Sequence, residues 1–162
     1  MRTRYSSIAL FLSLVVVVAA DAGLTVSYTF AQLMERADLV VVAIPLETRE
    51  TSERTELPDI WTSLPDGAKA PIRVGGVETV FKCLLVFKGA CPPDSVLTLH
   101  HYRELEKRAV VMSGPILLTF DPGVKRGFLM FLMREQDGRY APAGGQTDPG
   151  SNGIRALTGI SR

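Results

Sequence analysis

The clearest alternation of apolar and polar residues lies at 77–102, where VETVFKCLLVFKGACPPDSVLTLHHY predicts two strands joined by a turn. The first strand mixes β-branched, aromatic and aliphatic residues, which favours extended structure. Phe81 and Cys83 share one face, but Val86 falls on the opposite parity. Because side chains alternate strictly along a regular strand, this change of parity predicts a bulge near Leu84-Leu85.

A short helix is predicted before this hairpin, within residues 25–37. Thr29 precedes Gln32 by three residues, which is the spacing of a capping box. The apolar residues that follow recur with helical spacing and form one face: Phe30, Leu33, Met34 and Ala37. We therefore expect a helix that packs against the sheet.

Further strands are predicted on both sides of the hairpin. Leu39 to Ile44 is a continuous aliphatic run, which indicates a strand buried on both faces. Ile116 to Phe120 and Gly127 to Met133 read as two more strands, and Asp137-Gly138 is a hairpin signal after them. Because these strands follow one another with short turns, we expect an antiparallel sheet. The predicted fold is mainly β, a small five- or six-stranded OB-like barrel with one short N-terminal helix.

Residues 57–76 contain three prolines and three glycines and are predicted to form a long loop. The single tryptophan, Trp61, lies inside this segment. A loop tryptophan can stack on a sugar or anchor a partner protein. Since tryptophan is usually well buried, we expect instead that Trp61 covers the core from the loop.

The N-terminal segment is typical of a signal peptide. Arg2 and Arg4 are basic, an apolar run from Ile8 to Ala20 follows, and Ala20-Asp21-Ala22 fits the small-residue cleavage pattern. The apolar run is shorter than the roughly 20 residues that span a bilayer, although an uncleaved anchor is the alternative. We expect residues 1–22 to be the signal peptide and 23–162 a single exported domain, periplasmic or extracellular, without a membrane span. Cleavage after Ala20 is the second choice.

The charge balance narrows the possible partners. Lys and Arg number 18 and Asp and Glu number 17, which gives a net charge of +1. Removal of residues 1–22 would leave the mature chain neutral. There is no global charge to attract nucleic acid or an anionic membrane surface, so we expect no nucleic-acid partner.

Cys83 and Cys91 are the only cysteines. In an oxidising compartment, two cysteines eight positions apart suggest a disulfide. A disulfide requires Cα atoms within about 7 Å, so the loop would have to fold back along the strand. The alternative is that Cys83 is a small core residue and Cys91 a loop thiol.

The candidate catalytic residues are His100 and His101, the only histidines. Adjacent residues of a strand point to opposite faces, so the two cannot share one metal ion without a bulge; we expect one exposed and one semi-buried. Either could in principle act as the base for Ser95 or Ser113 in hydrolysis, but the sequence has no G-x-S-x-G nucleophile elbow. It also has no glycine-rich phosphate-binding loop. We therefore expect no catalytic, cofactor-binding or metal site.

The succession of strands resembles a group of exported bacterial proteins of unknown function. The pattern comprises an aliphatic strand after Ala37-Asp38, a strand ending in Lys88-Gly89, an aliphatic run at Phe128 to Leu132, and the hairpin residues Gly138 to Tyr140. It is also similar to the OB-fold barrels of the tissue-inhibitor-of-metalloproteinases and netrin-module superfamily. That resemblance implies a barrel. It does not imply protease inhibition, because those inhibitors use an N-terminal cysteine and several disulfides, whereas the mature chain here would begin at Gly23 or Asp21.

The expected function is a non-enzymatic binding or interaction module that recognises a protein or glycan through segments 57–76 and 144–153. A small hydrolase that uses His100 or His101 is one alternative. A structural component of the cell envelope is another. The ligand and the oligomeric state are not encoded in any motif.

Overall fold

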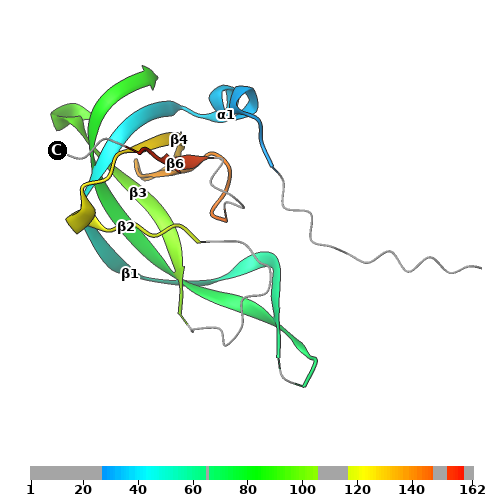
Figure 1. Ribbon diagram of the computed structural model, residues 1–162. Coiled ribbons are helices and arrows are strands. Elements are labelled where there is room, and N and C mark those ends of the chain that lie inside the picture. The colour runs from blue at the N-terminus through cyan, green and yellow to red at the C-terminus, as the bar shows by residue number, and fades with distance from the viewer. Residues whose placement is uncertain (1–26, 65, 106–116, 148–152, 159–162) are drawn as a thin grey trace, which may run out of the picture.

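The computed structural model describes residues 27–64, 66–105, 117–147 and 153–158 of the chain (Figure 1). The signal-peptide prediction for residues 1–22 and the residue Ser113 lie outside the described residues. The single α-helix is α1 (Phe30–Arg36). The strands are β1 (Leu39–Ser63), β2 (Lys69–Lys88), β3 (Val96–Glu104), β4 (Phe128–Arg134), β5 (Tyr140–Pro142) and β6 (Ile154–Ala156). Two short 3-10 turns, η1 (Pro93–Ser95) and η2 (Pro122–Val124), complete the elements.

Five of the six strands close into a ring, which confirms the small barrel-like β fold. The strands follow the order β1-β2-β3-β5-β4-β6, and β1 also pairs with β4. All pairings are antiparallel except that of β3 with β5, which is parallel and joins only Leu99 to Tyr140. The expectation of a purely antiparallel sheet is therefore wrong at this one contact. β5 reaches β3 after an antiparallel hairpin with β4, so it runs in the same direction as β3.

The inside of the ring is filled by large apolar side chains. Phe81, Leu99, Met130 and Leu132 are each fully buried there. Phe120 and Phe128 pack edge to face with Phe81 at ring-centroid distances of 5.0 and 6.3 Å. The predicted strand at Ile116 to Phe120 is wrong as a strand: of its described residues, only Leu117 forms an isolated bridge, to Thr147.

The helix α1 begins as the sequence predicts. Thr29 and Gln32 form both hydrogen bonds of the capping box. Only part of the predicted apolar face is buried, however. Leu33 is 1% exposed, whereas Phe30 and Met34 remain 48% and 40% exposed. The helix packs on β4 through Leu33, which is buried in one cluster with Phe131, and through the ring of Phe30, which lies 5.7 Å from that of Phe131.

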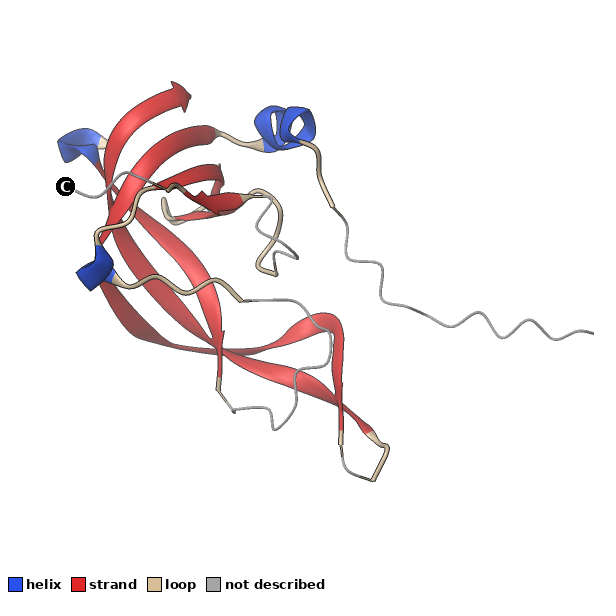
Figure 2. Cartoon of the chain, viewed as in Figure 1, coloured by secondary structure: helices blue, strands red, loops and turns tan. Residues whose placement is uncertain are grey.

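The segment predicted as a loop, 57–76, is instead the outer part of a long β-hairpin. β1 and β2 continue as paired strands from the ring to a turn at 64–68, with Trp61 opposite Pro71 and Ser63 opposite Lys69. Figure 2 shows this hairpin projecting away from the ring. Pro71 did not end β2: it pairs with Trp61 near the outer end of the hairpin, and a proline is tolerated in a strand where its missing backbone donor is not needed by a neighbour.

The bulge predicted near Leu84-Leu85 is confirmed. Val42 of β1 pairs with Leu85 and the next residue, Ala43, pairs with Cys83, so Leu84 has no partner on β1. A second irregularity leaves Phe87 unpaired between Val86 and Lys88. These two extra residues break the alternation of side chains at the end of β2.

Cys83 and Cys91 form a disulfide, which decides between the two alternatives left by the sequence. Their Cα atoms are 6.9 Å apart, because the chain turns back at Gly89 towards the inward-facing Cys83. We expect removal of this cross-link to lower the free energy of unfolding by about 2.5 kcal/mol, mainly by releasing the short closed loop in the unfolded chain.

Urea unfolding with and without reductant measures this loss. The double variant Cys83→Ala, Cys91→Ala is the control, since reductant should not change its midpoint. A wild-type midpoint that stays constant after both thiols are shown to be free would contradict the prediction.

Candidate functional site

The two histidines of β3 lie on opposite faces of the sheet, as strand parity predicts. In the register of β2 with β3, Glu78 lies opposite His100 and Val77 lies opposite His101. Both side chains are buried, with exposed fractions of 5% and 3%. The expectation of one exposed histidine is therefore wrong, because segments distant in sequence cover the outer face as well as the inner one.

His101 faces the inside of the ring. Its Nε2 lies 2.9 Å from the hydroxyl of Thr79, which in turn lies 2.9 Å from the hydroxyl of Thr48. The imidazole packs edge to face against Phe120 at 5.1 Å. Burial lowers the pKa of His101 to about 4, so the ring is neutral at physiological pH. This histidine is a structural part of the core.

His100 lies on the outer face between two carboxylates. Its Nδ1 is 3.0 Å from Glu135 Oε1, in the turn between β4 and β5. Its Nε2 is 3.1 Å from Glu53 Oε2 on β1, an ion-pair distance without hydrogen-bond geometry. Neither ring nitrogen is directed at open solvent. His100 thereby connects β1, β3 and the β4–β5 turn.

Glu53 reaches His100 because β1 bulges over a glycine. Glu50 pairs with Val77 and Arg54 with Gly75, so the three residues between them on β1 lie opposite Gly76 alone. A Cβ atom at Gly76 would lie 2.5 Å from the Thr51 hydroxyl and 2.9 Å from Glu53 Cβ. Only glycine allows this approach, so the Gly75-Gly76 pair was a signal for the site that the sequence reading missed.

Further charged and polar groups surround this contact. The Tyr102 hydroxyl donates a 2.6 Å hydrogen bond to Glu53, and burial raises the pKa of Tyr102 to about 12, which keeps it a donor. Glu78 is only 9% exposed and binds two arginines, Arg49 at 2.6 Å and Arg139 at 3.0 Å. The hydrogen bond from Arg49 is the largest of the effects that lower the pKa of Glu78.

We call the following group the outer polar cluster: Arg49, Glu53, Glu78, His100, Tyr102, Glu135 and Arg139. Its members come from β1, β2, β3 and the β4–β5 turn, and each acidic residue contacts at least one basic or hydroxyl group. The hairpin signal at Asp137-Gly138 is confirmed by this turn, in which the Glu135 amide donates to the Arg139 carbonyl over 2.8 Å. The cluster ties the base of the long hairpin to the rest of the ring.

Of the two serines that the sequence offers to the histidines, Ser95 lies at the other end of β3, on the exposed turn η1, and Ser113 lies outside the described residues. Within the parts of the chain that the structure describes, no group of three or more His, Cys, Asp or Glu side chains is arranged to hold a metal ion. The contacts of the outer polar cluster join β1, β3 and the β4–β5 turn.

Trp61 is on the projecting part of β1 and is 58% exposed. The expectation that it covers the core is wrong. The base of the projecting hairpin has a small core of its own, formed by Leu57, Ile72 and Val74 with Tyr102 and Leu117 packed against it. Trp61 is not among those residues. The other predicted binding segment, 144–153, is described only in part: Gln146 donates to the His100 carbonyl over 3.2 Å, and residues 148–152 lie outside the described ranges.

No helix in the described ranges is long and apolar enough to cross a membrane. Comparisons with known proteins point to no relative: no family model matches the chain, and no curated protein matches it.

Proposed function

We propose that the chain is an exported, non-enzymatic binding module that recognises a protein or glycan partner through the outer part of the β1–β2 hairpin. The observation that carries this proposal is the exposure of Trp61, 58%, on a hairpin that projects from the ring. Indole has a large apolar surface and one hydrogen-bond donor, so tryptophan is enriched among the residues that dominate binding energy.

The hairpin is held where it leaves the ring, which supports its use as a recognition arm. Arg49 binds Glu78 on the outer face, and Glu53 contacts His100 and Tyr102. These contacts fix β1 against β2 and β3 before the hairpin extends. A preorganised arm loses less conformational entropy on binding than a mobile loop does.

Two features support export. The N-terminal segment has the organisation of a signal peptide. The disulfide of Cys83 with Cys91 suits an oxidising compartment, since disulfides persist mainly outside the cytosol. We extend the similarity to the tissue-inhibitor and netrin-module superfamily to the barrel alone, because the metal-chelating N-terminal cysteine of those inhibitors has no counterpart in this chain.

The proposal is tested at Trp61 directly. Photo-crosslinking amino acids are placed at position 61 and, as a matched exposed apolar control, at Val124, which is 52% exposed. Irradiation in the cell envelope should give discrete protein adducts from position 61 and none of the same adducts from position 124. Identical adducts from both positions, or none from either together with no glycan binding, would contradict the proposal.

A glycan partner is tested separately. Trp61 is the only tryptophan of the chain, so its fluorescence reports on this one place. Binding of a glycan from an array should shift the emission of the wild-type protein, and Trp61→Ala should weaken binding at least tenfold, since truncation of a dominant aromatic contact costs about 2 kcal/mol or more. Val124→Ala should bind as the wild type does.

A further inference from the structure

The C-terminal end of β2 has a strand neighbour on one side only. β3 pairs with β2 as far as Lys82, which lies opposite Val96. β1 pairs further, as far as Lys88 opposite Val40. Among the described residues, no strand lies on the β3 side of residues 83–88, and no backbone hydrogen bond joins them to the returning segment 89–92. In Figure 1 this end of β2 is the green arrow that projects at the top of the view.

Four consecutive large apolar side chains occupy this end and are all exposed. Leu84 and Leu85 are 46% and 54% exposed, and Val86 and Phe87 are 36% and 58% exposed. We call these four residues the apolar edge. The two bulges explain why they do not alternate between buried and exposed, since Leu84 and Phe87 have no partner on β1. Single exposed apolar residues are ordinary, but a contiguous group marks an interaction surface.

Apart from its two bulges, the apolar edge carries none of the side chains that usually protect a strand edge. Natural edges carry lysines, prolines or inward charges that discourage pairing with another chain. Lys88 could serve, but its Nζ is turned towards α1, where it donates to the carbonyls of Met34 and Glu35 over 2.7 and 3.2 Å. The backbone donors and acceptors on the open side of the apolar edge are therefore accompanied only by apolar side chains.

The size of the apolar edge favours an extended segment over a second folded copy. A fully exposed Phe presents about 200 Å², so four large side chains that are half exposed present on the order of 400 Å². A stable interface between folded proteins buries about 800 Å² on each partner. A strand added to the sheet needs less surface, because its backbone hydrogen bonds supply much of the affinity.

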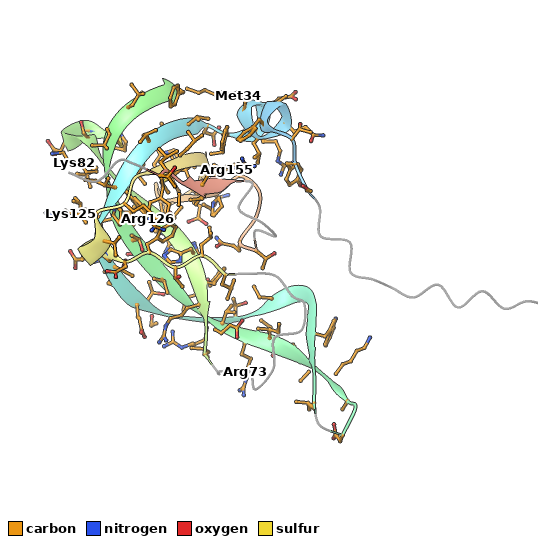
Figure 3. The ribbon with its side chains drawn as sticks, viewed as in Figure 1. Met34, Arg73, Lys82, Lys125, Arg126 and Arg155 are labelled. Carbon is orange, nitrogen blue, oxygen red and sulfur yellow. A yellow bond between two sulfur atoms is a disulfide. The ribbon has the colours of Figure 1, made fainter. Side chains whose placement is uncertain are left out.

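The charge beside the edge indicates the chemistry of that segment. Lys82 is exposed where β3 stops pairing and points outward from the ring (Figure 3). We propose that the apolar edge binds an extended segment of a partner protein, which adds as a strand beside β2. Its aliphatic side chains cover residues 84–87, and a carboxylate at one end pairs with Lys82. This surface is separate from Trp61 and does not depend on the function proposed for it.

A short synthetic peptide tests the proposal. The probe is a capped Glu-Val-Thr-Val-Thr-Val-Glu peptide, which is extended, β-prone and acidic at both ends. Nuclear magnetic resonance should show shifted and exchange-protected amides at residues 84–87 of the oxidised wild-type protein. Leu85→Lys should weaken binding at least tenfold. The matched control Val124→Lys and the variant Trp61→Ala should leave binding unchanged.

Reversal of the charge at Lys82 distinguishes a specific ion pair with this residue from nonspecific hydrophobic binding. Lys82→Glu should prefer the same peptide with lysines in place of the glutamates. Absence of peptide binding at millimolar concentration would overturn the proposal. A concentration-dependent dimer that Leu85→Lys abolishes would assign the edge to a second copy, and binding to phospholipid vesicles lost in the same variant would assign it to a membrane surface; either result also overturns it.

Discussion

Acidification from pH 7.5 to pH 4 is expected to lower the free energy of unfolding by about 3 kcal/mol through His101 alone. Burial holds the pKa of this imidazole at about 4 in the folded protein, against 6.5 for a histidine exposed to water. The unfolded chain therefore takes up a proton at a higher pH than the folded chain does. The stability is fully present above pH 6.5 and is lost as the pH falls towards 4.

The variant His101→Gln isolates this contribution. Its amide can still reach the hydroxyl of Thr79, which lies 2.9 Å from Nε2 in the wild type, but it does not titrate. Urea unfolding of both proteins between pH 7.5 and 4 should give a steep loss for the wild type and a shallower one for the variant. Glu78 acts in the same sense at lower pH, because its own lowered pKa favours the folded state only while it is ionised.

The matched control is Val124→Gln, which places the same amide at an exposed position that is 52% exposed in the wild type. It should keep the steep acid dependence of the wild type. Parallel curves for the wild type and His101→Gln across the whole interval would contradict the assignment of the acid-sensitive group to His101.

Replacement of Gly89 by alanine is expected to cost about 3 kcal/mol of stability, because two separate penalties combine there. Gly89 has a φ of +78°, a region that residues with a Cβ rarely adopt. A Cβ at this position would also come to 2.3 Å from the Asp38 carbonyl oxygen. Two hydrogen bonds hold Asp38 in place and oppose a shift of its carbonyl group. Its amide donates to the Leu132 carbonyl and its carboxylate accepts from the Arg134 amide, each over 2.8 Å.

Gly138→Ala is the matched control. Gly138 has a φ of +91°, but no atom lies within 4 Å of its ideal Cβ position. Its replacement should cost only about 1 kcal/mol, the strain of the left-handed conformation without a clash. The two urea midpoints measure the difference. Equal losses at both positions would show that the contact with Asp38 relaxes and that strain of the backbone is the whole effect.

Local patterns were sufficient to predict the elements that have one buried face. The capping box at Thr29, the parity of His100 and His101, and the bulge at Leu84 all depend on neighbours within a few residues, and each is confirmed. The outer half of the long hairpin gave no such signal. Its strands extend beyond the ring, so little there enforces alternation of apolar and polar residues, and prolines and glycines suggested a loop.

Gly75-Gly76 was the single local signal for the outer polar cluster, whose contacts could not be predicted because they join residues distant in sequence. Glu135 lies 35 residues from His100, and Tyr102 lies 49 residues from Glu53. The alternating charges around Glu53 look like a solvated surface, and nothing in their spacing indicates the bulge that lifts Glu53 across Gly76. The sequence also could not decide whether Cys83 and Cys91 form a disulfide, since this depends on how tightly the chain turns back at Gly89.

The closure of the ring has a consequence for the order of folding. β1, β2 and β3 are neighbours along the chain and can pair as a meander early in the reaction. The remaining strand pairing of β1 is with β4, where Leu39 lies opposite Leu132, far away along the chain. Closing so long a loop costs entropy that only late packing offsets, so this pairing should form last. Until β1 pairs with β4, the aliphatic residues of β1 that later meet β4 are exposed to other chains. A chaperone would therefore act at this part of β1.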